Sequence, residues 1–409
     1  MHRIDSATAE ADKFGTGKDG WTEGEPDATL PTQTTEDWFD GVQEEICNVV
    51  ESADVTLIKN TRDQLYDAIM FMMRRAAIMD MWQPMTNPKL FTLRSVIYDS
   101  YSDYLFACGV ADGADAYMLR SINAGMDWSE MANPVNTDLY GMASNGAGTI
   151  VAVGKLDAGS SYVISSTNDG GTWTRRTISG VGYLYGVVWA ENLFVAVGRE
   201  ASLAQINTSP DGITWTRRTY SSTEGLYAVT HSPDLGLFCA VGDNYSADTK
   251  AATSPDGVTW TERSTGITPG NFYSVCWSEF LQLFVAVGQD IGNYPLIGTS
   301  PDGITWTART TGLIDISGDL NAVISLEDAR VLLAVGQHTN NNSIQGFISR
   351  DGISWTYHNI VVNGGIGNME TARSAALAAD QGAVIVSGGA VGGSPIGATL
   401  IRVPYRQLP

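Results

Sequence analysis

Short apolar runs alternate with polar turns along most of this chain, and residues 226–264 show the pattern clearly. The run Leu237–Val241 is continuously apolar, which is typical of a strand covered on both faces. Thr259–Arg263 alternates between polar and apolar residues, as a half-exposed outer strand does. The turn Ser254–Gly257 contains Pro-Asp-Gly, in which each residue favours a turn. The stretch therefore predicts four strands, over residues 226–230, 237–241, 251–253 and 259–263.

This unit repeats along the chain. Six tryptophans are spaced 42 to 49 residues apart, and most of them close an Asp-Gly-x-Thr-Trp phrase: Trp128, Trp173, Trp215, Trp260, Trp306 and Trp355. A second marker, Ala-x-Gly, recurs in step with them at 107–109, 152–154, 196–198, 240–242, 286–288 and 334–336, with Val386-Ser-Gly388 as a seventh copy. A period of 40–50 residues rich in β-formers predicts a propeller.

The ends of the repeat array complement each other. No tryptophan phrase follows Gly388, so the last repeat lacks its outer strand. Trp82-Gln-Pro-Met-Thr-Asn-Pro88 reads like the segment from Trp128 to Pro134, yet nothing before it resembles the rest of a repeat. We therefore expect a mainly β fold, a seven-bladed β-propeller over residues 81–409, closed by this N-terminal strand. Six blades plus an irregular closing element remain an alternative.

The tryptophan phrase carries a family resemblance. Ser166-Thr-Asn-Asp-Gly-Gly-Thr-Trp173 resembles the Asp-box of sialidase-like propellers, and the other copies resemble it with the Asp shifted one place towards the Gly. In that family the box is a structural turn between the third and fourth strands of a blade. The resemblance implies the fold and says little about activity.

Residues 1–80 contain none of the repeat markers. They predict an extended segment and two helices, over about 35–50 and 61–79, which make a small α-helical attachment module. Five phrases, in this order, resemble the N-terminal module of bacteriophage tail-fibre and related virion proteins: 2–9, 12–20, 42–46, 50–53 and 64–69. The sequence departs from that pattern near Asp54. The resemblance implies that residues 1–80 attach to other phage tail or baseplate proteins.

Composition limits the function classes. The formal net charge is −21, with 17 acidic and 7 basic residues among the first 80. An acidic chain without a basic stripe does not favour nucleic-acid binding. We expect no signal peptide and no membrane insertion, because the start is charged and no apolar stretch reaches the length of a span. Cys47, Cys108, Cys239 and Cys276 have no paired spacing and are expected to be buried free thiols. No cofactor or metal site is expected.

One position of the first strands varies from repeat to repeat. It holds Arg94, Tyr140, Tyr185, Tyr227, Tyr273, Asn321 and Arg373. First strands of propeller blades line the central channel, so these side chains are expected near an axial opening. Tyrosines stack on sugars and arginines bind carboxylates, which makes the set a candidate receptor site. The alternative is that the tyrosines fill core wedges and the arginines are channel charges.

The connections between second and third strands vary in length and chemistry. Loops on a rigid scaffold are where binding residues concentrate. The further candidates for receptor contact are Tyr245, Tyr294, His338, Asn340, Asn341 and Asn342.

Taken together, the sequence predicts a phage tail fibre or other receptor-binding virion protein, made in the host cytoplasm and located in the virion tail. A homotrimer is expected because tail fibres usually are trimers. The propeller is expected to bind a host surface receptor, a glycan in preference to a protein, and not to be an enzyme; linked copies would strengthen weak single contacts. Two alternatives remain open, a structural adaptor that docks another fibre protein and a glycan-cleaving tailspike.

Overall fold

The computed structural model describes residues 46–47, 65, 83–84, 92–110, 116–157, 160–179, 182–201, 203–220, 222, 224–243, 249–267, 270–310, 317–338, 343–360, 371–378, 383–389 and 400–404. The chain separates into two compact units, residues 1–76 and residues 77–407. In the first unit only residues 46, 47 and 65 are described, and these are helical. The attachment module and its two helices therefore lie outside the described residues, and they stay predictions together with the 80/81 boundary.

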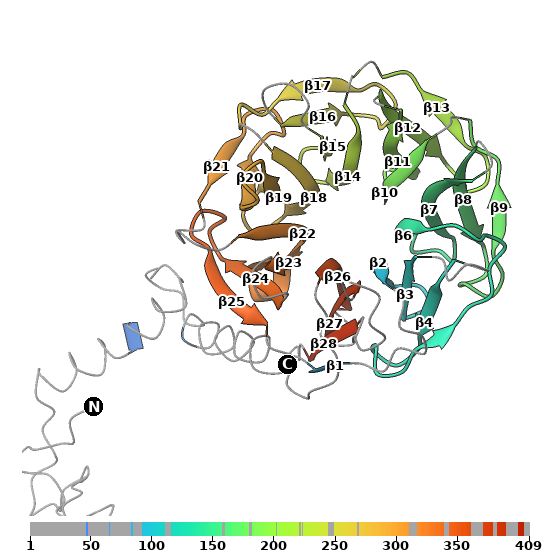
Figure 1. The fold of residues 1–409 in the computed structure, drawn as a ribbon, viewed down its shortest axis with the longest axis horizontal. Helices are drawn as coiled ribbons and strands as arrows, with labels where there is room; N and C mark the ends of the chain where they lie inside the picture. Colours follow the sequence, from blue (N-terminus) through green and yellow to red (C-terminus); the bar gives the residue numbers. More distant parts are fainter. Residues whose placement is uncertain are drawn as a thin grey trace, which may run out of the picture. The chain divides into compact units, whose positions relative to one another are not determined.

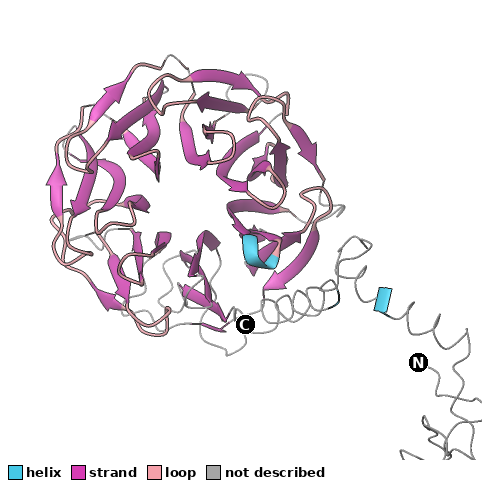
Figure 2. Cartoon of the chain, turned by 180° about the vertical axis from the view of Figure 1, so that it is seen from behind, coloured by secondary structure: helices cyan, strands magenta, loops and turns pink. Residues whose placement is uncertain are grey.

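The second unit is mainly β and forms a β-propeller, as the sequence predicts. The described strands form seven antiparallel four-stranded sheets arranged around a centre, and Figure 1 shows the first strand of each sheet innermost. We call each sheet a blade. Figure 2 shows the same ring from behind, with the helical turn η1 (Glu327–Ala329) between two strands. None of the helices in the described part is long and apolar enough to span a membrane.

The strand bounds follow the repeats. The first four blades in chain order are β2 (Leu93–Asp99), β3 (Tyr104–Gly109), β4 (Met118–Ser121) and β5 (Ser129–Glu130); β6 (Leu139–Ser144), β7 (Ile150–Asp157), β8 (Ser160–Ser166) and β9 (Thr174–Arg176); β10 (Tyr183–Ala190), β11 (Leu193–Glu200), β12 (Leu203–Ser209) and β13 (Thr216–Arg218); β14 (Leu226–Ser232), β15 (Leu237–Gly242), β16 (Lys250–Ser254) and β17 (Thr261–Ser264). The others are β18 (Gly270–Ser278), β19 (Leu283–Asp290), β20 (Pro295–Ser300) and β21 (Thr307–Arg309); β22 (Gly318–Leu326), β23 (Val331–His338), β24 (Ser343–Ser349) and β25 (Thr356–Ile360); and β26 (Thr371–Ala378), β27 (Ala383–Gly389), β28 (Leu400–Pro404) and β1 (Gln83–Pro84).

The last sheet combines both ends of the repeat array. Its strand order is β1-β28-β27-β26, so the outer position is taken by a strand that precedes all the others in sequence. Gln83 pairs with Arg402 and Pro84 with Ile401. Because of this pairing, the strand that precedes the first repeat and the strands of the last repeat are joined by hydrogen bonds within one sheet.

Apolar side chains between neighbouring blades form the core. Phe194, Phe238 and Phe284 are the second residues of the second strands β11, β15 and β19, and all three are fully buried. One cluster joins Cys239 and Val241 of one blade to residues of the next blade, including Phe272. Burial on both faces explains the continuous apolar runs that the sequence shows in the second strands.

The Asp-box turns lie between third and fourth strands, and their geometry explains the repeated phrase. The Asp302 side chain accepts hydrogen bonds from the backbone N–H groups of Ile304 (2.8 Å) and Thr305 (2.7 Å). Gly303 adopts a positive φ of 69°, and the Trp306 indole N–H donates to its carbonyl oxygen at 3.1 Å. The turn thus satisfies backbone donors that a sharp reversal would otherwise leave free.

The structure corrects one detail of the predicted repeat and adds another. The outer strand β17 begins at Thr261 and not at Thr259, because the buried Trp260 belongs to the turn through its bond to the Gly257 carbonyl oxygen. In the box that ends at Trp173, Asn168 and not Asp169 accepts the bond from the Thr172 N–H at 2.9 Å.

The cysteine prediction also needs correction. All four cysteines are free, and Cys108 and Cys239 are buried. Cys47 and Cys276 are partly exposed, so the expectation of four buried thiols was wrong for these two.

Candidate functional site

A register shift marks the same place in the first strand of every blade. The pairing of β18 with β19 jumps between Phe272 and Ser274, so Tyr273 is left without a partner across the ladder. The same jump leaves the equivalent residue unpaired in the other six blades: Arg94, Tyr140, Tyr185, Tyr227, Asn321 and Arg373. A β-bulge of this kind turns one side chain away from the regular alternation. We call these seven the axial residues.

The glycine of the Ala-x-Gly marker is what permits the close approach at six of the seven shifts. A Cβ placed on Gly288 would lie 1.8 Å from the carbonyl oxygen of Asn271, two residues before Tyr273. The corresponding distance is 1.9 Å at Gly336, to the Asp319 carbonyl oxygen. Any side chain here would force the first two strands apart. The marker thus has a local cause, and that cause is tied to the axial residues.

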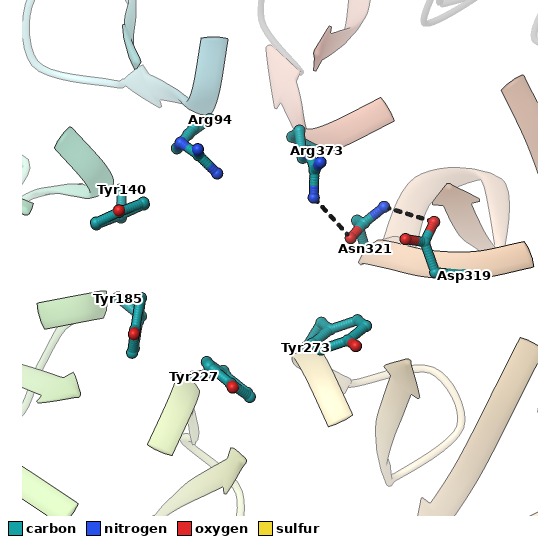
Figure 3. Close-up of a pocket in the computed structure, with 8 residues that line it drawn as sticks. All are labelled: Arg94, Tyr140, Tyr185, Tyr227, Tyr273, Asp319, Asn321 and Arg373. Carbon is teal, nitrogen blue, oxygen red and sulfur yellow. Dashed lines mark hydrogen bonds between the residues drawn. The ribbon is translucent and has the colours of Figure 1, made fainter. Parts of the chain in front are cut away.

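The axial residues meet in one pocket. All seven line a cavity of about 330 Å³, together with Asp319. Figure 3 shows the four tyrosines following one another along one side and Arg94 and Arg373 as neighbours on the other. The structure therefore brings together the whole set that alignment of first strands selected, while its role in binding stays a prediction.

The tyrosines form a continuous aromatic arc. The ring centroids of Tyr140 and Tyr185 are 5.4 Å apart, those of Tyr185 and Tyr227 5.0 Å, and those of Tyr227 and Tyr273 5.7 Å, all in tilted or edge-on geometry. Such contacts fix the orientation of the rings. Burial raises the pKa of Tyr140 to about 12 and also raises the pKa values of the other three, so all four hydroxyls stay neutral near pH 7.

The other side of the pocket carries the charged groups. The Arg94 guanidinium carbon lies 4.8 Å from the centroid of the Tyr140 ring, a cation–π contact. Arg373 donates a long hydrogen bond of 3.4 Å to the side-chain oxygen of Asn321. Asn321 in turn donates to Asp319 at 2.9 Å. Burial lowers the pKa of Arg373, and the nearby positive charge of Arg94 lowers it further.

Sequence reasoning missed three charged residues in or beside the pocket. Asp319 lies two residues before Asn321, and burial raises its pKa. Arg199 and Asp243 follow the Ala-Val-Gly markers directly and form an ion pair at 3.3 Å. Burial raises the pKa of Tyr227, as does its hydrogen bond to Asp243. The residue type that follows each Ala-x-Gly marker varies from repeat to repeat, and this variation could have pointed to Arg199 and Asp243.

The structure does not place any of the described loop residues predicted to contact a receptor among the residues that line the pocket. Tyr294 and His338 lie next to the loops that connect second and third strands. These loops lie at the same end of each blade as the axial residues, because Gly270, at the start of β18, pairs with Asp290, and Gly318, at the start of β22, pairs with His338. Tyr294 is exposed and neither residue lines the pocket. Tyr245, Asn340, Asn341 and Asn342 lie outside the described residues.

The pocket combines aromatic, amide and charged side chains. It offers aromatic faces and edges, neutral phenolic hydroxyls and two guanidinium groups, which suits a polar ring with a negative substituent. No group of three or more metal-ligating side chains occurs among the described residues.

Comparison with known proteins gives a fold and one partial relative. No family model matches the chain. The solved structure of YCF48 bound to D1 peptide has a TM-score of 0.56 and 13% identity and covers 80% of this chain and 97% of its own. YCF48 from Cyanidioschyzon merolae has a TM-score of 0.55 and 15% identity, covering 80% and 99%. These likenesses show a β-propeller of the YCF48 type, and at such identity they show the fold alone.

The partial relative is the uncharacterized protein StfP of Escherichia coli (strain K12). It is 50% identical to this chain over 70 residues, which are 17% of this chain and 34% of StfP. The chain thus matches about a third of the length of that relative.

Proposed function

We propose that this chain is a bacteriophage virion protein of the tail-fibre class, whose propeller binds a receptor on the host surface. Residues 1–80 attach it to other tail or baseplate proteins, and residues 81–409 form a seven-bladed ring closed by the N-terminal strand. The phage assignment is supported by the phrases between residues 2 and 69 and by the match to StfP, a name that suggests a side tail fibre.

The axial pocket carries the receptor-binding part of the proposal. Seven separate repeats each direct one bulged side chain into it, and these side chains differ where the scaffold repeats. A purely structural ring would need only wedge-filling apolar residues there. Four neutral tyrosines and two arginines instead match the groups that bind sugars. The receptor we propose is accordingly a surface glycan.

The mode of action is reversible adsorption without chemistry on the receptor. We propose a homotrimer located in the virion tail and synthesised in the host cytoplasm, so that several linked pockets engage the host surface together. Linked weak sites give a combined affinity far above that of one site. The pocket's carboxylate, Asp319, is held by the Asn321 side chain and the Gln337 N–H, which suits a structural role and not proton transfer.

Binding of the labelled full-length chain to cells that the phage infects tests this proposal. The cells are compared before and after their surface polysaccharide is stripped. The proposal expects saturable binding that is lost on stripping. Binding that survives stripping would make the receptor a protein. Absence of binding in both states would reject the adsorption role and favour an adaptor that docks another virion protein.

A further inference from the structure

The two arginines of the axial pocket have unused hydrogen-bond donors. The Nε atoms of Arg94 and Arg373 are buried, and neither has a hydrogen-bond partner among the described residues. Buried polar atoms are almost always satisfied, so an unsatisfied pair in one pocket calls for an explanation. Both belong to residues on the adjacent first strands β2 and β26, which pack against each other.

The two guanidinium groups also repel one another. The charge of Arg94 acts on Arg373 and adds to the lowering of its pKa by burial. Two like charges held together in a partly buried site destabilise it unless an anion lies between them. The pocket contains two arginines and one aspartate in a chain whose formal net charge is −21. An excess of positive charge here runs against the charge of the whole chain.

Asp319 does not fill this role. One of its oxygens already accepts hydrogen bonds from Asn321 at 2.9 Å and from the Gln337 N–H at 3.0 Å. Arg373 contacts the Asn321 oxygen and makes no ion pair with Asp319 among the described residues. Burial raises the pKa of Asp319, and the backbone N–H of Gln337 and the positive charge of Arg373 oppose that rise. Asp319 thus offsets part of the Arg373 charge from a distance, but neither pocket arginine forms an ion pair with a carboxylate among the described residues.

The other groups in the pocket indicate which kind of ligand would supply a negative group between the arginines. Figure 3 shows Tyr185, Tyr227 and Tyr273 across the cavity from the arginines and Tyr140 beside Arg94. The four tyrosines present neutral hydroxyls that can both donate and accept hydrogen bonds. The volume of about 330 Å³ is near the lower limit of small-molecule pockets, so it fits one or two sugar rings and not a folded segment.

We propose that the axial pocket binds a carboxylate-bearing sugar residue of an acidic surface polysaccharide. Its carboxylate lies between Arg94 and Arg373, and its ring lies against the tyrosine arc. This inference rests on the proposed function and specifies its ligand class. Charge-assisted bonds from the two guanidinium groups to this carboxylate would remove the like-charge repulsion.

Calorimetric titration of the full-length chain tests the inference. The probes are the methyl glycosides of glucuronic, galacturonic and N-acetylneuraminic acids, each compared with its neutral counterpart that lacks the carboxylate. An acetylated dialanine supplies a carboxylate without a sugar. We expect at least one acidic glycoside to bind at least tenfold more tightly than its neutral counterpart and than the dipeptide. Equal affinity for the neutral sugar, tightest binding of the dipeptide, or no binding of any probe would overturn the proposal.

Variants separate binding from folding. Arg94→Gln and Arg373→Gln are each expected to weaken binding of the acidic glycoside by at least tenfold and to leave the propeller folded, because relief of the repulsion offsets the loss of one cation–π contact or one long hydrogen bond. Arg309→Gln, on the outer strand β21, is the matched control with the same loss of charge, since its Nε already bonds Thr299 at 2.8 Å. Unchanged affinity in both pocket variants would refute the assignment.

The two levels of the account fail in different ways. If no acidic glycoside binds but the chain still adsorbs to host cells, the ligand class is wrong and the proposed function stands. If adsorption to cells is also absent, the proposed function fails as well.

Discussion

Replacing Gly288 with alanine tests the explanation of the axial bulges. A Cβ at this position would lie 1.8 Å from the Asn271 carbonyl oxygen, whereas carbon and carbonyl oxygen approach no closer than about 3.3 Å in favourable contacts. The strands β18 and β19 would have to separate by roughly 1.5 Å, the difference between these distances. Overpacking of this kind costs about 3 kcal/mol of the free energy of unfolding.

Gly236→Ala is the control for this change. Gly236 has a positive φ of 55° in the turn between β14 and β15, and no heavy atom lies within 4 Å of the added Cβ. The cost is then only the left-handed backbone strain, about 1 kcal/mol. Guanidinium chloride unfolding followed by tryptophan fluorescence measures both variants. A Gly288→Ala variant no less stable than Gly236→Ala would refute the claim that the marker glycine exists to admit the bulge.

Two further expectations concern the Asp-box turns. Asp256→Ala should lower the free energy of unfolding by about 1 kcal/mol, because it removes the acceptor of the hydrogen bond from the Thr259 N–H. Asp256→Asn should lower it by less than about half of that, because Asn168 already accepts the equivalent bond in another blade. Denaturant unfolding measures both variants, and equal losses would show that the turn bonds do not matter. Hydrogen bonds from the Thr259 and Val258 N–H groups hold the pKa of Asp256 below its usual value. Burial acts to raise the pKa values of Asp211, Asp302 and Asp351, but the equivalent hydrogen bonds outweigh burial and lower them. Since these folded-state pKa values lie below the unfolded ones, their contribution is complete above about pH 5 and is lost as the pH falls through the folded-state values. Unfolding measured from pH 6 to pH 2.5 should show this loss, and a profile flat below pH 4 would contradict it.

The repeat made most of the fold predictable from the sequence. The spacing of Trp215, Trp260 and Trp306 and the apolar second strands depend on local turns and on burial between blades, and both leave a periodic signal. Aligning the first strands also selected every axial residue, because the sequence alone shows which position of the repeat differs from one copy to the next.

Other features depend on contacts between distant residues. The bulge at Tyr273 and the need for Gly288 follow from the approach of two strands, which no local pattern encodes. Asp319 was missed because its importance comes from its neighbours, Asn321 and the Gln337 N–H. The start of the outer strand was misplaced at Thr259 because alternation alone cannot tell a buried turn residue, such as Trp260, from a strand residue.

The central claim is that the tyrosine arc of the axial pocket contacts the host receptor. Saturable binding of the full-length chain to host cells, compared with that of the double variant Tyr185→Leu/Tyr227→Leu, tests it most directly. Leucine keeps apolar volume at both positions, so circular dichroism and the melting temperature should show a folded propeller. The account predicts that the double variant loses saturable binding. Undiminished binding by a folded double variant would contradict the account.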